Sequence, residues 1–366
     1  MIMPVLLFII LICVLWACLF LQSARFGAPP RGDALRRIQQ SPNYRNGRFQ
    51  NLSPTPALTE GAGFFSILKK FYFDKHDRRA PASALPSVKT NLQNLESSKN
   101  ILVWFGHSSY FMQIDRKTIL VDPVFSGNAS PLRFTTRSFP GTDVYDVDEL
   151  PFIDYLFLTH DHWDHLDYKT IIGLKKKVNR VITGLGVAAH LQRWGYDMSN
   201  IKEMDWNTQL ELDSGFSVNS ISARHFSGRG LKRNRTIWSS FILKSPGKKI
   251  FIGGDSGYDR HFAKAGQLFG PFDLVILENG QYNESWKYIH MFPEEAVQAA
   301  LDLGAAKLMP VHWAKFTLSL HSWDEPILRI KEEAMKKNIN LLHPRIGEPV
   351  DLDAPSVFDS WWEGIL

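Results

Sequence analysis

The stretch Leu158-Thr159-His160-Asp161-His162-Trp163-Asp164-His165-Leu166-Asp167 decides the fold of this chain. It follows an apolar run, residues 152–158, that has the composition of a β-strand. Because His160 and His162 are two positions apart, at a strand end their side chains point the same way, whereas Asp164 and His165 approach from beyond a turn. Imidazoles and carboxylates clustered in this way are typical metal ligands. The segment therefore favours ligands for two neighbouring metal ions over a solvated polar loop.

Three later segments with the composition of β-strands are each followed by a histidine or an aspartate, residue types that bind metal ions. These residues are His225, Asp255 and His312. A single His or Asp after a strand is usually an ordinary loop residue, but a dinuclear zinc centre needs about four protein or water ligands per ion. Three such positions therefore extend the first cluster into a predicted metal centre.

The order of these ligands, His-x-His-x-Asp-His followed by His, Asp and His at later strand ends, resembles the metallo-β-lactamase superfamily. Further motifs resemble the branch that contains N-acyl-phosphatidylethanolamine-hydrolysing phospholipase D. The similarity runs from about residue 100 to about residue 330. The motifs that carry it are Trp104-Phe105-Gly106-His107-Ser108-Ser109, Ile119-Leu120-Val121-Asp122-Pro123-Val124-Phe125-Ser126, Gly253-Gly254-Asp255-Ser256-Gly257-Tyr258, Phe269-Gly270-Pro271-Phe272-Asp273-Leu274, His290-Met291-Phe292-Pro293-Glu294-Glu295-Ala296-Val297 and Val311-His312-Trp313.

The resemblance implies an α/β fold, the metallo-β-lactamase-like αββα four-layer sandwich. Local patterns agree with it: residues 101–105 and 119–121 read as strands, and residues 293–303 read as a helix with Pro in its first turn and Gly304 beyond its end. In one departure, Met291-Phe292 stands where the branch usually has Val-Asp, which removes the expected N-cap carboxylate.

The resemblance also implies a ligand set, and all seven positions carry the expected residue type. His160, His162 and His225 would hold one zinc ion, Asp164, His165 and His312 the other, and Asp255 would bridge the two. A water shared by two such ions loses a proton near neutral pH and becomes a nucleophile beside the substrate. Other divalent transition metals also suit nitrogen and oxygen ligands.

Asp164 and His290 are the catalytic candidates. Asp164 would orient the attacking hydroxide. His290 matches a family histidine that lies at the pocket, where it would contact a phosphate oxygen or protonate a leaving group; the alternative is a solvated residue at a helix entry. Asp122 and Asp167 are expected to orient ligands, with an N-cap role open for Asp167, and His107 is assigned a structural role.

Residues 1–22 are predicted to form a transmembrane anchor or an uncleaved signal. Met1 to Leu21 contains no charged side chain, and about twenty helical residues cover the ~30 Å hydrocarbon core of a bilayer. No basic region precedes it, so a cleaved or lipidated signal is the alternative. By the positive-inside rule, the arginines that follow place the catalytic domain on the cytoplasmic face. They are Arg25, Arg31, Arg36, Arg37, Arg45 and Arg48, with Asp33 the only acid among them.

The rest of the chain is expected to contain a basic, Pro-rich linker and wrapping segment, residues 23–98, and one hydrolase domain, residues 99–366. The net charge of +5 is too small and too dispersed to indicate nucleic-acid binding. Both cysteines, Cys13 and Cys18, lie in the apolar N-terminal run, so the chain has no disulfide framework.

Together these patterns predict a membrane-associated dinuclear zinc phosphodiesterase. Its expected reaction is phospholipase D-type hydrolysis of N-acyl-phosphatidylethanolamine, or a related phospholipid, to phosphatidate and an N-acylethanolamine. The alternatives are a metal-dependent lactonase or phosphodiesterase of a small soluble metabolite, and a non-catalytic metal-binding membrane scaffold. Dense aromatic residues suit an apolar groove, and basic residues around His225 suit an anionic phosphate. These basic residues are Arg224, Arg229, Lys232, Arg233 and Arg235.

Overall fold

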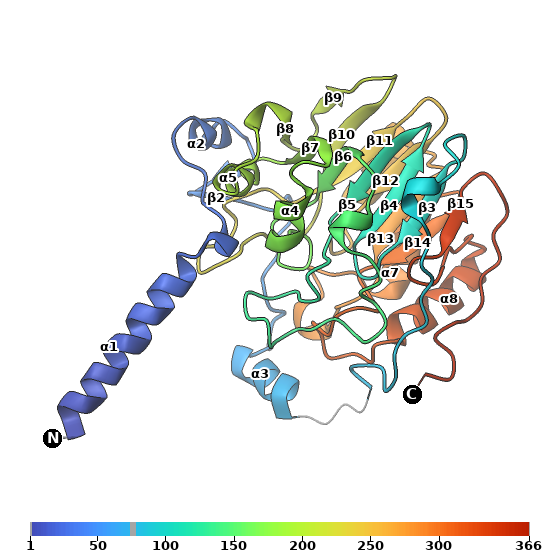
Figure 1. The fold of residues 1–366 in the computed structure, drawn as a ribbon. Coiled ribbons are helices and arrows are strands. Elements are labelled where there is room, and N and C mark those ends of the chain that lie inside the picture. Colours follow the sequence, from blue (N-terminus) through green and yellow to red (C-terminus); the bar gives the residue numbers. More distant parts are fainter. Residues whose placement is uncertain (1, 74–77, 366) are drawn as a thin grey trace.

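Two mixed β-sheets pack face to face in the computed structural model, which describes residues 2–73 and 78–365 (Figure 1). The seven-stranded sheet has the order β15 (Pro349–Asp351), β3 (Ile101–Trp104), β4 (Tyr110–Ile114), β5 (Lys117–Val121), β6 (Ile153–Leu158), β7 (Val178–Gly184) and β8 (Ile201–Met204). The six-stranded sheet has the order β14 (Leu308–Val311), β13 (Leu274–Glu278), β12 (Lys249–Ile252), β11 (Ser239–Lys244), β10 (Ser217–Ser222) and β9 (Gln209–Glu211).

Helices cover the outer face of each sheet, which confirms the predicted αββα sandwich. Apolar residues of α4 (Tyr168–Leu174) and α5 (Ala188–Arg193) pack in one cluster with the outer face of the seven-stranded sheet. Those of α6 (His261–Phe269), α7 (Pro293–Leu303) and α8 (Glu325–Lys337) pack with the six-stranded sheet. Short 3-10 turns complete the domain: η1 (Ala24–Phe26), η2 (Leu92–Asn94), η3 (Val147–Glu149), η4 (Met198–Asn200) and η5 (Glu284–Trp286).

Strand β3 illustrates why the sequences of the central strands are almost entirely apolar. Leu102 and Trp104 point into the core between the two sheets, whereas Ile101 and Val103 point to the helix-covered face. Successive strand residues face opposite sides, so a strand that is buried on both sides has no polar positions to alternate with. Such an apolar scaffold holds the polar strand ends in place.

Helix α7 has the predicted bounds, and its entry is stabilised without an N-cap carboxylate. Glu295, in the first turn, accepts a hydrogen bond from the backbone N–H of Phe292 at 3.0 Å. Glu278, at the end of β13, accepts one from the N–H of Met291 at 3.0 Å. Gly304 ends the helix in the left-handed conformation, with φ 68°. Two glutamates therefore replace the missing capping aspartate and fix the chain next to His290.

The N-terminal segment contains more regular structure than the predicted linker. It forms α1 (Ile2–Leu21), α2 (Gly32–Gln39), the short strands β1 (Tyr44–Arg45) and β2 (Arg48–Phe49), and α3 (Phe64–Phe73). Ile38 and Phe49 are buried in one cluster with Trp206 and Trp238, so this part of the segment packs against the sheets. The α1 helix projects away from the domain (Figure 1) and is long and apolar enough over Met3–Leu21 to cross a membrane, a test that a signal sequence also passes.

Candidate metal centre

The predicted ligand residues meet at one edge of the sandwich, where strands from both sheets end. The loop after β6 carries His160, and the loop after β12 carries Asp255. Gly254 lets these two loops approach, because it has φ 60° and a Cβ there would lie only 2.9 Å from the Cβ of Thr159. His225 and His312 follow β10 and β14 to the same edge. The strand ends thus bring together residues that are far apart in the sequence.

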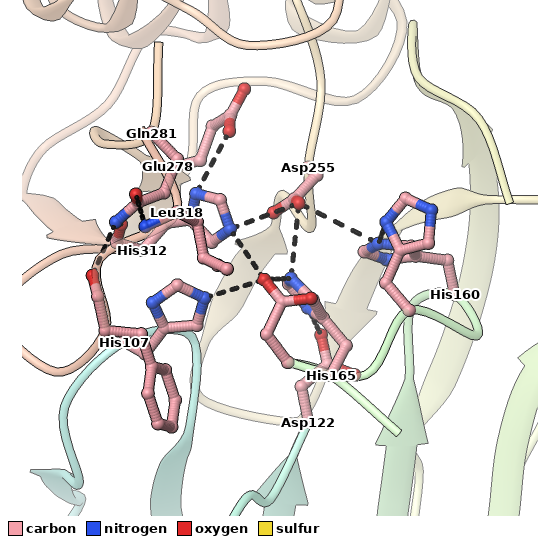
Figure 2. Close-up of polar contacts among 12 residues, drawn as sticks. His107, Asp122, His160, His165, Asp255, Glu278, Gln281, His312 and Leu318 are labelled. Carbon is pink, nitrogen blue, oxygen red and sulfur yellow. Dashed lines mark hydrogen bonds and ion pairs between the residues drawn. The ribbon is translucent and has the colours of Figure 1, made fainter. Parts of the chain in front are cut away.

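Asp255 lies at the centre of this cluster (Figure 2). Its Oδ2 atom is 3.2 Å from Nε2 of His165 and 3.2 Å from Nε2 of His312. The same atom is 3.6 Å from Nε2 of His225 and 3.8 Å from Nε2 of His160. One carboxylate oxygen therefore faces imidazoles of both predicted ligand groups, which is the position of a bridging ligand.

The first group contains His160, His162 and His225 together with Asp255. Nδ1 of His162 lies 2.9 Å from Nε2 of His160 and 3.2 Å from Nε2 of His225. All four residues offer ligand atoms within 4.8 Å of one another, close enough to hold one metal ion.

The second group contains Asp164, His165 and His312, and it also includes His107. Oδ2 of Asp164 is 3.3 Å from Nε2 of His312 and 3.6 Å from Nε2 of His165. Nε2 of His107, to which the sequence assigned a structural role, is 2.9 Å from the same oxygen. Backbone hydrogen bonds between His107 and His312 and between His107 and Trp313 hold the two loops together. His107 thus contacts the Asp164 carboxylate directly and helps to fix its orientation.

Outer hydrogen bonds turn three of the imidazoles toward the centre. Nδ1 of His165 donates to Asp122 at 2.8 Å, and Nδ1 of His225 donates to the carbonyl of Ile289 at 2.8 Å. Nδ1 of His160 lies 3.0 Å from Oγ1 of Thr159. When one ring nitrogen binds an outer partner, the other presents its lone pair to the cluster, as metal-binding histidines do. The expected orienting role of Asp122 agrees with this geometry.

Several buried polar atoms of the cluster lack a hydrogen-bond partner among the described residues. They include Nε2 of His162, Nε2 of His165 and Oδ1 of Asp255. Orphaned buried groups are costly, so such a concentration indicates that another group satisfies them. Burial lowers the pKa of His162 to about 4. Burial opposes ionisation of Asp255, but the facing His165 and His312 hold its pKa well below the ordinary value. A neutral His162 and an ionised Asp255 carboxylate are in the protonation states in which these groups bind a metal ion.

Left-handed backbone conformations are concentrated at the same edge. His107, Asp122 and His312 have φ values of 52°, 41° and 70°. Such values are uncommon outside glycine and occur where surrounding contacts fix them, often at functional sites. The fold therefore holds these three side chains in place against a local preference of the backbone.

His290 lies next to the cluster, beside a glutamate that sequence reasoning missed. Oε2 of the fully buried Glu278 is 2.5 Å from Nδ1 of His290, while Oε1 accepts hydrogen bonds from the N–H groups of Met291 and Ser256. Burial raises the pKa of Glu278 well above its usual value and lowers the pKa of His290. With Nδ1 held by Glu278, the Nε2 edge of His290 is the edge left for the pocket.

A pocket of about 460 Å³ opens onto this cluster. Its polar wall includes Asp164, Asp255 and His290, and its remaining wall is largely apolar. Helix α3 contributes Phe64 and Ile67 to that wall, although the helix was not predicted from the sequence. The other apolar lining residues are Ala57, Leu58, Phe226, Trp286, Ile289 and Leu318.

For two other sets of candidate residues, the structure distinguishes between roles that the sequence left open. Asp167 is the N-cap of α4 and accepts from the N–H of Lys169 at 3.3 Å, so it has the capping role that was left open. Of the basic residues around His225, Arg233 lines the pocket. Arg229 does not, because its buried guanidinium donates to backbone carbonyls, including that of Leu166 at 2.6 Å. The expected cationic loop is thus only partly available to a substrate.

Comparisons with known proteins agree with the fold. A family model described as "Beta-lactamase superfamily domain" matches residues 117–313. An uncharacterized protein of Mycobacterium tuberculosis is 37% identical over 328 residues, which are 88% of each chain. N-acyl-phosphatidylethanolamine-hydrolyzing phospholipase D 1 of Caenorhabditis elegans is 29% identical over 305 residues, 78% of this chain and 84% of its own. The solved structure of Igni18, a metallo hydrolase of Ignicoccus hospitalis, matches this structure with a TM-score of 0.52 at 21% sequence identity. The match covers 69% of this chain and 97% of the Igni18 chain.

The matched region contains β5, the whole loop of His160 to Asp167, and the later positions His225, Asp255 and His312. It spans more than half of the 366 residues. The chain therefore belongs to the metallo-β-lactamase superfamily of metal-dependent hydrolases.

Proposed function

We propose that the cluster holds two zinc ions and that the protein is a membrane-associated phosphodiesterase. The orphaned buried nitrogens and the central Asp255 carboxylate fit a metal centre of nitrogen and oxygen ligands. His160, His162 and His225 would hold one ion, Asp164, His165 and His312 would hold the other, and Asp255, which faces histidines of both groups, would serve both. When bound, the ions supply an activated water and stabilise negative charge that develops on the substrate.

The side chains around the centre divide the remaining work. Asp164, held by His107 and facing the pocket, orients the attacking water. His290, held by Glu278, presents Nε2 to the pocket and donates a proton or a hydrogen bond to an oxygen of the phosphodiester. The Arg233 guanidinium lines the same pocket and suits an anionic phosphate.

The observation that carries the lipid substrate is the apolar wall of the pocket. A sugar phosphate would leave Phe64, Ile67 and Trp286 uncovered, whereas an acyl chain would bury them. Helix α3 also exposes apolar surface on its outside, with Phe65 exposed by 83% and Phe73 by 79%. We therefore propose N-acyl-phosphatidylethanolamine, or a related phospholipid, as the substrate and phosphatidate with an N-acylethanolamine as the products. The name of the Caenorhabditis elegans relative supports this class.

We further propose that residues 1–22 form a single-pass anchor, residues 23–98 a wrapping linker and residues 99–366 the hydrolase domain on the cytoplasmic face. None of the residues in the apolar span Met3–Leu21 is buried in the protein, which supports an environment of lipid. The basic residues that follow α1, beginning with Arg25, support the orientation.

A substrate panel tests this proposal. The full chain, purified in detergent and loaded with zinc, is assayed on N-acyl-phosphatidylethanolamine in mixed micelles, on a soluble phosphodiester and on a lactone, with Asp255→Ala as the blank. We expect turnover of the lipid and weaker turnover of the soluble phosphodiester. Turnover of the lactone or of the soluble ester alone would replace the lipid by a small metabolite. Bound metal without turnover of any substrate would indicate a non-catalytic scaffold.

A further inference from the structure

A second cavity, of about 850 Å³, lies where the N-terminal helix joins the domain. Leu21 and Gln22, at the end of α1, form part of its lining, together with Phe26 of η1 and Arg193 of α5. Figure 1 shows α1 meeting the domain on the side of α2 and α5. The metal pocket has a different lining, so the two cavities are separate.

The lining of this juxtamembrane cavity is strongly cationic. Asp161 is the one acid among its described lining residues, and its carboxylate is already engaged: it accepts from the N–H of Gly228 at 2.6 Å and lies 3.1 Å from Nε2 of His190. Across residues 2–73 and 78–365, no arginine or lysine of the lining forms an ion pair with a carboxylate. These side chains are Arg31, Arg193, Arg229, Lys232 and Arg235.

Three of these five cations donate hydrogen bonds to other groups of the protein, and two are free to bind a ligand. Arg235 donates to the hydroxyl of Tyr44 at 3.5 Å. Arg193 donates to the carbonyls of Gly27 and Gln22, and Arg229 donates to those of Asp161 and Leu166. Arg31 and Lys232 are exposed and form no side-chain hydrogen bond within the described part of the chain. The cavity therefore has arginines held by backbone carbonyls and, at its rim, exposed cations without a protein partner among the described residues, an arrangement that suits a phosphate group.

The position of α1 fixes the depth of the cavity relative to a bilayer. If Met3–Leu21 fills the hydrocarbon core, Leu21 marks its boundary, and the residues that surround the cavity lie at the level of the lipid headgroups. Leu231, next to Lys232, is 87% exposed, as expected for an apolar tip that enters the interface. The exposed Lys232 and the exposed Leu231 are thus neighbours at the level of the lipid headgroups.

We propose that this cavity binds the phosphate-bearing headgroup of an anionic glycerophospholipid from the leaflet in which α1 ends. The inference rests on the membrane-anchor part of the proposed function and not on the hydrolytic reaction. Asp161, which lines the cavity, lies between the proposed metal ligands His160 and His162. A bound headgroup therefore lies next to the loop of residues 160–167, on the side away from the metal pocket. The headgroup site is thus distinct from the site that would take the substrate.

Binding of fluorescent phosphatidylglycerol to the full chain in zwitterionic detergent micelles, followed by anisotropy, tests the proposal. Arg31→Ala with Lys232→Ala removes the free rim cations. Lys176→Ala with Lys337→Ala is the matched control, because it removes the same charge from exposed lysines that do not line the cavity. Arg31→Lys with Lys232→Arg keeps the charge. Phosphatidylcholine and glycerol phosphate are the competing ligands, and thermal unfolding reports whether each variant is folded.

We expect the rim variant to bind phosphatidylglycerol about thirtyfold more weakly, since each cation near the surface contributes ~1 kcal/mol. The control and the charge-keeping variants are expected to bind as the native chain does, and neither phosphatidylcholine nor glycerol phosphate should compete. Equal losses in the rim and control variants, or unchanged binding in the rim variant, would overturn the site. If glycerol phosphate at the same concentration displaced phosphatidylglycerol, the conclusion that the cavity binds a lipid, and not a free phosphate ester, would be wrong. Because no turnover is measured, failure of the hydrolase proposal leaves this result unaffected.

Discussion

The carboxylate of Glu278 lies 2.5 Å from Nδ1 of His290 and ties a histidine of the pocket rim to the end of a buried strand. The same carboxylate accepts hydrogen bonds from the backbone of Met291 and Ser256, the latter being the residue that follows Asp255. Glu278 therefore links the chain that carries His290 to the chain that carries the proposed bridging ligand. Glu278 is not one of the seven predicted ligands, yet it contacts both of these chain segments at the pocket.

Glu278→Gln is expected to lower kcat by about tenfold to a hundredfold, because an amide holds the His290 ring less firmly. Metal content and KM should change little. Glu295→Gln is the control, since Glu295 caps the same stretch of chain from the other side without contacting His290. Steady-state kinetics and metal analysis check the prediction, and equal activity in the two variants would show that His290 needs no partner.

Asp122→Asn should weaken metal binding by about tenfold to a hundredfold, because the hydrogen bond from Nδ1 of His165 loses its charged acceptor. Asp167→Asn removes a carboxylate from the same loop region, but Asp167 caps α4. That variant should lose at most ~1 kcal/mol of unfolding free energy and keep its metal affinity. Competition with a chromogenic chelator measures both variants. Comparable metal loss in both would mean that the loop, and not the orientation of His165, controls affinity.

Ile67→Ser should reduce kcat/KM for a long-chain phospholipid by about tenfold, because the substituted wall loses the burial of an aliphatic side chain. Turnover of a soluble phosphodiester should be unchanged. Phe65→Ser on the same helix controls for contact of the exposed α3 surface with the micelle, as Phe65 is exposed and does not line the metal pocket. The acyl-chain role of α3 would be wrong if both substrates lost activity to the same extent.

Removal of metal should destabilise the fold as well as stop turnover. The cluster gathers buried groups without hydrogen-bond partners, including Nε2 of His165 and Oδ1 of Asp255, around a site that a metal ion stabilises by binding the folded state. A chelator is expected to lower Tm by several degrees, on the order of 2–4 °C per kcal/mol lost, and zinc should restore it. Asp255→Ala should show no such response. An unchanged Tm on full metal removal would argue against a loaded centre in the native protein.

The proposed ligands were accessible from the sequence because each follows a strand, and strand ends meet at one edge of a layered fold. His160 and Asp255 are far apart in sequence, yet short apolar runs precede both. Glu278 obeys the same pattern at the end of β13, but Asn279 and Gly280 follow it and make the site resemble an ordinary turn. No local signal distinguishes a buried acid from a solvated one at such a position.

The environment of charged residues and the role of α3 could not be derived from the sequence. Arg229 belongs to a run of basic residues, and only the packed structure shows that backbone carbonyls occupy its guanidinium. Phe64–Phe73 lacks a wide polar face, and its helix contacts the rim of a pocket instead of a core. The sequence pattern of a surface helix is recognisable when one face of the helix is apolar and buried and the other is polar and solvated. Helix α3 lacks that contrast, because its apolar residues line a pocket.

The origin of the new oxygen atom in the products tests whether the protein carries out phospholipase D-type hydrolysis at a metal centre organised by Asp255. Zinc-loaded full chain is incubated with N-acyl-phosphatidylethanolamine in heavy-oxygen water, with Asp255→Ala as the blank, and the products are identified by mass spectrometry. We expect phosphatidate that carries one heavy oxygen, together with unlabelled N-acylethanolamine, from the native chain only. Label in the N-acylethanolamine, release of a fatty acid, or the same products from Asp255→Ala would contradict the account.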